Sequence, residues 1–162
     1  MTTATFTPHQ FDRNADYEDA LLALIASARH ELRLFEKDYA ETGLSSRAFA
    51  EALAHAFATH EPLTVTLLAL EPDHIAAHCP RILALRETWS HRFTLLRVAQ
   101  VPELWHAGFA IADDARYVKR HHFDWPRGEA SDDARAIAGL NEVWGNLWQS
   151  AEAEASWQRL ML

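Results

Sequence analysis

Residues Leu63–Leu70 read LTVTLLAL, and this stretch decides the fold class. Eight residues suit a strand, and the run has little polar character on either of the faces that a strand presents. Strands of this kind occupy buried positions in largely parallel sheets, where helices cover both faces. Pro62 and Pro72 bound the run, since proline interrupts regular backbone pairing. We therefore expect Leu63–Leu70 to be a buried strand of an α/β domain.

Amphipathic helices are predicted before this strand. Over Asp16–Ala28 and Ser45–His60, apolar residues recur at spacings of three and four, which places them on one helical face. Asn14 or Asp16 is suited to cap the first helix. The apolar faces consist of Tyr17, Leu21, Leu24, Ile25 and Ala28 in the first helix and of Phe49, Leu53 and Phe57 in the second.

The rest of the chain continues an alternation of strands and helices. This alternation favours a mixed, mainly parallel sheet with helices on both faces, and 162 residues suit one domain, residues 1–162. The N-terminal tail and residues 121–131 have no predicted element. Further strands are predicted over residues 31–38, 93–99, 104–112 and 116–120, a helical region broken before Pro80 over 72–90, and a long helix over 132–154 that buries Ile137, Leu140, Trp144, Leu147 and Trp148.

Composition restricts the function and the compartment. The net charge of -8 opposes broad nucleic-acid binding, which needs a surface that neutralises phosphate. A single cysteine, Cys79, excludes a disulfide within the chain and suits a reducing compartment. Met1–Gln10 has no signal-peptide pattern, and no run approaches the roughly 20 apolar residues of a membrane helix. We therefore expect a cytoplasmic protein with no broad nucleic-acid binding and no membrane association.

A second stretch carries functional information: His106–Asp113 reads HAGFAIAD. It resembles the H-x-K-x4-D signature of the phospholipase D superfamily, with Gly108 at the lysine position. The order of the predicted elements is similar to that superfamily too, and the terminal helix has large apolar residues at four-residue spacing in Leu140, Trp144 and Trp148. The resemblance covers nearly the whole chain and implies one phospholipase D-like half.

The resemblance implies a site that is shared between two such halves. In the superfamily one histidine attacks phosphorus, the other protonates the leaving oxygen, and the lysines stabilise charge on the phosphoryl oxygens. The matching histidine and aspartate are His106 and Asp113, and a direct contact between them is an open alternative. Because Gly108 supplies no charge, we interpret His106 and Asp113 as vestigial catalytic residues. This chain has no second copy of the motif, so we expect a homodimer.

The downstream positions also depart from the superfamily pattern. A glycine-serine pair and an asparagine are usual there, and the matching positions hold Arg120, His121 and Asp124. A carboxylate at Asp124 would repel phosphate. However, Lys119, Arg120 and His121 lie on or after the predicted hairpin and could bring positive charge near His106, and arginine binds phosphate through its planar fork. We therefore predict an anion-binding pocket at Arg120 and His121.

Two groups of histidines have metal-ligand chemistry. His74 and His78 are four residues apart and precede Cys79, but His74 is not followed by the glutamate of the zinc-protease pattern. The segment His121–Asp124 could hold a metal with His106, although its spacing is not diagnostic. We interpret both groups as surface residues and expect no metal and no cofactor.

Two further features flank the motif or the predicted strands. Glu36, Lys37 and Asp38 end a strand, where open α/β sheets collect functional groups, but a solvated, salt-bridged cluster is the simpler interpretation. Trp105 and Trp125 flank the motif, and tryptophans in such places mark a binding surface when they are exposed.

The sequence supports three functions. The first is a catalytically degenerate phospholipase D-like domain that acts as an association or anion-binding module, with a phosphate-bearing ligand or a protein as partner. The alternative is a phosphodiesterase assembled across a homodimer with His106 as nucleophile. The third is a metal-binding module around the clustered histidines. The missing lysine at Gly108 favours the first.

Overall fold

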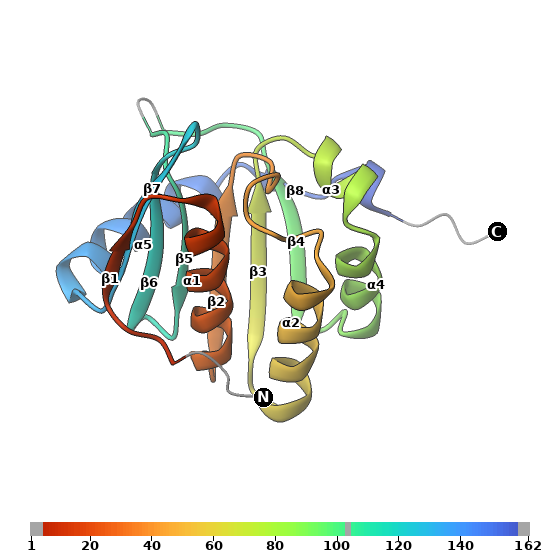
Figure 1. The fold of residues 1–162 in the computed structure, drawn as a ribbon. Coiled ribbons are helices and arrows are strands. Elements are labelled where there is room, and N and C mark those ends of the chain that lie inside the picture. Colours follow the sequence, from red (N-terminus) through yellow and green to blue (C-terminus); the bar gives the residue numbers. More distant parts are fainter. Residues whose placement is uncertain (1–4, 103–104, 159–162) are drawn as a thin grey trace.

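The structure, a computed structural model, describes residues 5–102 and 105–158. Within these residues a single sheet has the strand order β1-β7-β6-β5-β2-β3-β4-β8 (Figure 1). The strands are β1 (His9–Phe11), β2 (Glu31–Glu36), β3 (Thr64–Ala69), β4 (Phe93–Val98), β5 (Gly108–Ala112), β6 (Arg116–His122), β7 (Trp125–Ser131) and β8 (Ala151–Glu152).

Helices cover both faces of this sheet. In Figure 1 α1 (Asn14–Ser27) and α2 (Arg47–Thr59) lie in front of the strands, and α5 (Ala134–Trp148) lies behind them. The predicted α/β class, with a mixed sheet covered on both faces, is therefore confirmed. The helices are α1 (Asn14–Ser27), α2 (Arg47–Thr59), α3 (Asp73–His78), α4 (Pro80–Thr88), α5 (Ala134–Trp148) and the 3-10 helix η1 (Ala155–Trp157).

Parallel pairing is confined to the middle of the sheet. β3 pairs in parallel with β2 and with β4, whereas β5 pairs antiparallel with β2 and begins the antiparallel part of the sheet. The expectation of a mainly parallel sheet thus holds for three strands only. The prediction for LTVTLLAL is confirmed, since Val65, Leu67 and Leu68 in β3 are at most 1% exposed.

Two apolar cores hold the layers together. Leu32 and Leu34 of β2 pack toward α1 and α2, and Phe35 packs on the opposite side against α5, as the predicted alternation requires. Burial of one such side chain stabilises the fold by roughly 1.5–3 kcal/mol. Trp148 was wrongly predicted to be buried, because it is 48% exposed. The buried residues of α5 are Ile137, Leu140, Trp144 and Leu147.

The stretch predicted to be irregular, residues 121–131, instead contains β7. β7 pairs with β6 and with β1, so the N-terminal tail also holds a strand. Pro126 and Gly128 conceal the strand pattern in the sequence. Gly128 is required by close packing, since a Cβ atom there would lie 2.1 Å from the Lys119 carbonyl oxygen and 2.7 Å from the Phe11 ring.

Two helix ends differ from prediction. The backbone N-cap of α1 is Arg13, which makes no capping hydrogen bond, and Asp16 forms an ion pair with Arg13 at 2.9 Å. The last helix ends at Trp148 rather than near residue 154, because the chain turns there to add β8 to the edge strand β4.

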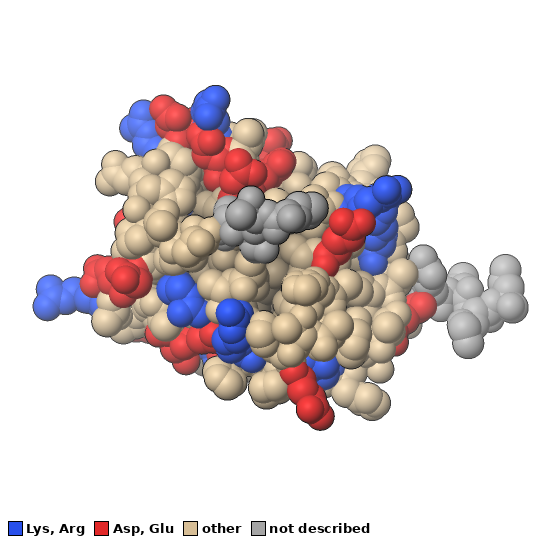
Figure 2. All heavy atoms as spheres, turned by 60° about the horizontal axis from the view of Figure 1, so that its bottom comes forward, with Lys and Arg blue, Asp and Glu red and all other residues tan. Residues whose placement is uncertain are grey.

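The surface carries charges of both signs. On the face at the bottom of Figure 1, basic side chains occur singly or beside acidic ones and do not join into a broad basic patch (Figure 2). Among the residues that the structure describes, no helix has both the length and the apolar character that a bilayer crossing requires.

Candidate functional site

The histidine of the motif lies just before β5 rather than on a strand. β5 begins at Gly108, four residues after the predicted start at Leu104, which itself lies outside the described residues. His106 is exposed, and its carbonyl oxygen accepts a hydrogen bond from the Phe123 N–H at 2.7 Å. The His106 and His122 ring centroids are 5.4 Å apart. Backbone pairing therefore brings the end of β6 beside the motif.

A carboxylate occupies the space that a side chain at Gly108 would need. A Cβ atom added to Gly108 would lie 1.9 Å from Oε2 and 2.3 Å from the carboxyl carbon of Glu36. Real Cβ atoms do not approach other atoms so closely, so no side chain fits at Gly108 unless Glu36 moves. Glu36 is 1% exposed, so the interpretation of Glu36 as part of a solvated cluster was wrong.

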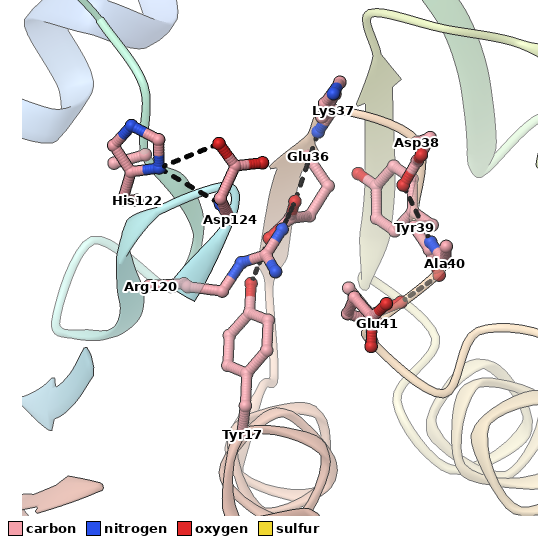
Figure 3. Close-up of polar contacts among 12 residues, drawn as sticks. Tyr17, Glu36, Lys37, Asp38, Tyr39, Ala40, Glu41, Arg120, His122 and Asp124 are labelled. Atoms are coloured by element: carbon pink, nitrogen blue, oxygen red, sulfur yellow. Dashed lines mark hydrogen bonds and ion pairs between the residues drawn. The ribbon is translucent and has the colours of Figure 1, made fainter. Parts of the chain in front are cut away.

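Glu36, Arg120 and Tyr17 form a buried polar network, in which the three side chains point toward one another (Figure 3). Arg120 Nη2 donates to Glu36 Oε1 at 2.6 Å, and the Tyr17 hydroxyl donates to Oε2 at 2.7 Å. The Lys37 backbone N–H adds a third hydrogen bond to Glu36 at 3.2 Å. Arg120 is the register partner of Gly108 in the β5–β6 ladder. A glycine at this position leaves room for the guanidinium to reach Glu36.

Burial controls protonation in this network. Burial raises the pKa of Glu36, and the Arg120 charge and the Tyr17 hydroxyl oppose that shift. Burial, reinforced by the Glu36 carboxylate, raises the pKa of Tyr17 well above its ordinary range. The phenol therefore stays protonated and acts as a hydrogen-bond donor to Glu36. The predicted anion-binding Arg120 is 3% exposed and already bound to Glu36. An anionic ligand at Arg120 would have to compete with that internal carboxylate.

The aspartate of the motif, Asp113, lies at the opposite end of β5. As predicted, Asp113 and Asp114 form a tight turn, with φ values of 56° and 53°. The Asp113 carboxylate accepts hydrogen bonds at 2.8 to 2.9 Å from the backbone N–H groups of residues 29–31. It also pairs with Arg116 at 2.9 Å. The whole of β5 separates Asp113 from His106, so the two do not contact each other.

These hydrogen bonds favour the charged form of Asp113. Burial alone would raise the pKa of its carboxyl group, but the three backbone N–H groups and the Arg116 charge outweigh burial. The pKa of Asp113 therefore lies below its ordinary value. Asp113 ties the β5–β6 turn to the start of β2, which is a structural task.

His106 borders a cavity of about 430 Å³ at the carboxyl end of β2. Lys37 and His122 line this cavity with it. The predicted anion-binding His121 does not line it. Its side chain is 41% exposed, and its Nε2 lies 3.9 Å from a carboxylate oxygen of Glu129. The neighbour of His106 is thus His122, one residue further along than the sequence pattern suggested.

His122 is held by the next turn of the chain. Its Nδ1 accepts a hydrogen bond from the Asp124 N–H at 3.1 Å and lies 3.7 Å from the Asp124 carboxylate. An accepting Nδ1 carries no proton, so this geometry corresponds to a neutral imidazole with its proton on Nε2.

The histidine groups do not form a metal centre in the described part of the chain, where no three His, Cys, Asp or Glu side chains converge as ligands. The His74 and His78 ring centroids are 5.0 Å apart, but a third ligand is missing among the described residues. The neighbouring Cys79 is buried, and burial raises the pKa of its thiol to about 12. The thiol therefore stays protonated and is a poor metal ligand.

Solved structures with the same fold include members of the phospholipase D class. The chain is similar to NucT from Helicobacter pylori, with a TM-score of 0.65, 13% identity, and coverage of 92% of this chain and 99% of NucT. It is also similar to Nuc, a phospholipase D family member from Salmonella typhimurium, with a TM-score of 0.64, 13% identity, and coverage of 90% and 97%. The predicted phospholipase D-like fold is therefore confirmed.

The same fold occurs in TrmBL2, an archaeal chromatin protein with a novel mode of DNA binding. The TM-score is 0.67 at 12% identity, and the match covers 92% of this chain and 54% of TrmBL2. The chain thus spans about half the length of TrmBL2. Residues 13–160 match the family described as "Domain of unknown function (DUF7931)", and the chain belongs to that family. No curated protein matches the sequence.

Proposed function

We propose that this chain is a catalytically degenerate phospholipase D-like domain that acts by association and retains an anion-binding cavity beside His106. One observation carries the proposal: the Glu36 carboxylate fills the space above Gly108 and is bound there by Arg120 and Tyr17. The superfamily's chemistry needs a lysine cation at this point, to stabilise negative charge on the phosphoryl oxygens. A fixed carboxylate has the opposite charge.

The cavity still suits a small anion. Lys37, His106 and His122 line it together, so one ammonium group and two imidazoles border it. Asp124 lines it as well and opposes an anion. We therefore expect weak binding of inorganic phosphate that Lys37→Ala and His106→Ala reduce. The sequence-based prediction that Arg120 and His121 bind the anion stays a prediction. Phosphate binding by Arg120→Met and by His121→Ala, compared with that by His122→Ala, tests it.

The second candidate function is a phosphodiesterase assembled across a homodimer with His106 as nucleophile. Lys37 favours it, because its side chain lines the same cavity as His106 and supplies a cation from β2 rather than from β5. The buried Glu36 beside Gly108 argues against it, since a carboxylate opposes the charge that develops on phosphate.

Hydrolysis of bis(p-nitrophenyl) phosphate and of single-stranded DNA separates these functions. We expect no turnover above that of a His106→Ala variant at any pH between 5 and 8. Turnover that disappears in His106→Ala and falls in Lys37→Ala would overturn the degenerate assignment and support the phosphodiesterase. His91→Ala, an exposed histidine on the loop before β4, is the matched control.

Association is proposed to join two copies of this chain at the face that carries His106. A two-fold interface presents the same patch from both subunits, so the two motif edges would meet. Trp125 is 62% exposed at this edge, whereas Trp105 is partly buried and donates from its indole to the Ala107 carbonyl at 2.8 Å. Sedimentation at micromolar concentration is expected to detect a dimer that Trp105→Glu and Trp125→Glu weaken and Trp148→Glu does not. A monomer at every concentration contradicts the homodimer.

Broad nucleic-acid binding is not part of this proposal. The net charge is -8, and the face in Figure 2 has no broad basic patch. TrmBL2 shares the fold, so DNA binding is the outcome that would change this view. A gel-shift assay with duplex DNA at 50 and 200 mM salt is expected to find no complex at micromolar protein.

A further inference from the structure

We propose that a second cavity, between the chain after β2 and the β6–β7 turn, binds an arginine side chain presented by a protein partner. The volume of this cavity is about 280 Å³, which suits one long side chain and part of its backbone. It adjoins the His106 cavity, since Lys37, Phe123 and Asp124 line both. The inference does not depend on whether the His106 site is catalytic, and it concerns the free chain, because the proposed dimer would also use Trp125.

The charge of the lining favours a cation. Three acidic residues, Asp38, Glu41 and Asp124, line this cavity. Within the described part of the chain none of the three forms an ion pair with a lysine or arginine. Opposing them are Lys37 and Arg120, and the Arg120 charge is offset by Glu36 beneath the cavity. Three carboxylates against one uncompensated ammonium attract a basic group rather than a phosphate.

An exposed aromatic ring stands beside these carboxylates. Trp125 lines the cavity and is 62% exposed, with its ring 4.7 Å from the His122 ring. A guanidinium group stacks on tryptophan while its edge donates to carboxylates, because it is planar and weakly hydrated. Tryptophan is also the residue type most enriched at the energetic centres of protein interfaces. The combination suits arginine better than any anion.

One of the lining residues also has a buried hydrogen-bond donor without an acceptor. Arg120 lines the cavity and is 3% exposed, and its Nε–H has no partner among the described residues. Buried donors are nearly always satisfied, so an unpaired one calls for an acceptor from elsewhere. A peptide segment brings both groups that the cavity lacks, a backbone carbonyl for Arg120 and a basic side chain for the carboxylates. An inorganic cation has no acceptor, and a phosphate has no positive charge.

The acidic side chains are held in place before a ligand arrives (Figure 3). Asp38 Oδ1 accepts from the Ala40 N–H at 3.0 Å, and Glu41 Oε2 accepts from Asn14 Nδ2 at 2.8 Å. Between them Tyr39 is buried with φ at 69°, in the left-handed region that a bulky residue rarely adopts. Its hydroxyl donates to the Leu68 carbonyl at 2.9 Å. Fixed carboxylates lose less entropy when they bind a ligand.

The test is a titration of the full chain with the peptide acetyl-Gly-Arg-Gly-amide, followed by the Trp125 indole N–H resonance in 1H–15N spectra. The same peptide with citrulline in place of arginine has nearly the same shape and no charge. We expect binding of the arginine peptide to be at least about fivefold tighter than that of the citrulline peptide, the effect of one charge-assisted contact of about 1 kcal/mol. Trp125→Phe assigns the indole resonance.

Two variants and one control locate the site. Asp124→Asn and Glu41→Gln are each expected to weaken binding of the arginine peptide by about threefold or more, read from the Trp125 resonance. Trp148→Ala removes the exposed tryptophan of α5 and is expected to leave binding unchanged. Glu41 and Asp124 are both exposed, so Glu41→Gln and Asp124→Asn keep the fold.

Three results would overturn the proposal: equal binding of the arginine and citrulline peptides, an arginine effect that persists in both carboxylate variants, or a Trp125 shift caused by inorganic phosphate and not by the arginine peptide. His106→Ala separates this site from the proposed function. It is expected to weaken phosphate binding at the first cavity and to leave arginine binding at the second unchanged.

Discussion

The two ends of β5 have kept the motif in different ways. At the Asp113 end the motif residue is present, and it binds three backbone N–H groups and Arg116. At the Gly108 end the motif lysine is absent, and Glu36 and Arg120 occupy the space with an ion pair of their own. Asp113 has a task in folding whether or not the domain is an enzyme. Its presence therefore says little about catalysis, whereas the ion pair at the Gly108 end bears directly on it.

The largest expected effect is at the Gly108 end. Arg120→Met leaves the Glu36 carboxylate buried without its cation, which costs about 3–5 kcal/mol of unfolding free energy in comparable buried pairs. Urea denaturation measures this loss of unfolding free energy. The double variant Glu36→Met/Arg120→Met is expected to recover most of the loss, because neither charge is then buried. Arg127→Met, at an exposed arginine on β7, is the control. A loss below about 1 kcal/mol for Arg120→Met would mean that the pair is solvated.

The next prediction concerns a lysine placed at Gly108, where the superfamily pattern has one. Gly108→Lys must displace the Glu36 carboxylate, so we expect a loss of about 1–3 kcal/mol, as for overpacked cores, and no hydrolysis of bis(p-nitrophenyl) phosphate. Gly145→Lys on α5 is the matched control, since a Cβ atom there meets nothing within 4 Å. Lysine is also a better helix former than glycine. Clear turnover from Gly108→Lys alone would show that the rest of the site is intact.

A smaller effect is expected at the Asp113 end. Asp113→Asn keeps the shape but removes the charge that three N–H groups and Arg116 favour, at a cost of about 1.5 kcal/mol. The pKa of Asp113 is lower in the folded than in the unfolded chain. The stability that it provides is therefore fully present above the ordinary carboxyl value of about 3.9 and is lost as the pH falls through the folded pKa.

The pH dependence distinguishes this charge effect from a loss of shape. The difference in unfolding free energy between wild type and Asp113→Asn should be constant at neutral pH and shrink below about pH 4. Asp132→Asn, at an exposed position before α5, should show no such difference. A difference that is independent of pH down to pH 2 would contradict the charge-based account.

The sequence predicted the layers of the fold better than its edges. LTVTLLAL and the apolar faces of α1, α2 and α5 follow periodicities that burial imposes, so these elements were predictable. β7 was missed because Pro126 and Gly128 resemble loop residues. Gly128 is required by the Lys119 carbonyl oxygen and by the Phe11 ring, and Phe11 lies more than 100 residues away in the chain. β8 has only two residues, and its pairing with β4 leaves almost no local pattern.

The candidate site was predictable only in part. Gly108 and His106 were found from the motif, but the partner of the glycine was not, because Glu36 lies 72 positions away and no local spacing connects them. Arg120 was correctly singled out as a cation near the motif, yet its charge is directed at Glu36. The bulge between Arg120 and His122 shifts the register of β6 against β7, and counting positions cannot detect such a shift. His122 rather than His121 lies beside His106 because the antiparallel register that pairs Gly108 with Arg120, continued two residues outward, places His106 opposite His122.

The smallest effect on stability is expected at His106, and it completes the comparison of the two motif residues. His106 is exposed and its backbone carbonyl makes the hydrogen bond to Phe123, so His106→Ala keeps that bond. We expect the unfolding free energy to change by no more than about 0.5 kcal/mol, as at other exposed positions. Phosphate binding is the property that should respond. If His106→Ala destabilised the chain as much as Asp113→Asn does, both motif residues would have structural roles. The proposal that the cavity beside His106 binds a ligand would then lose its support.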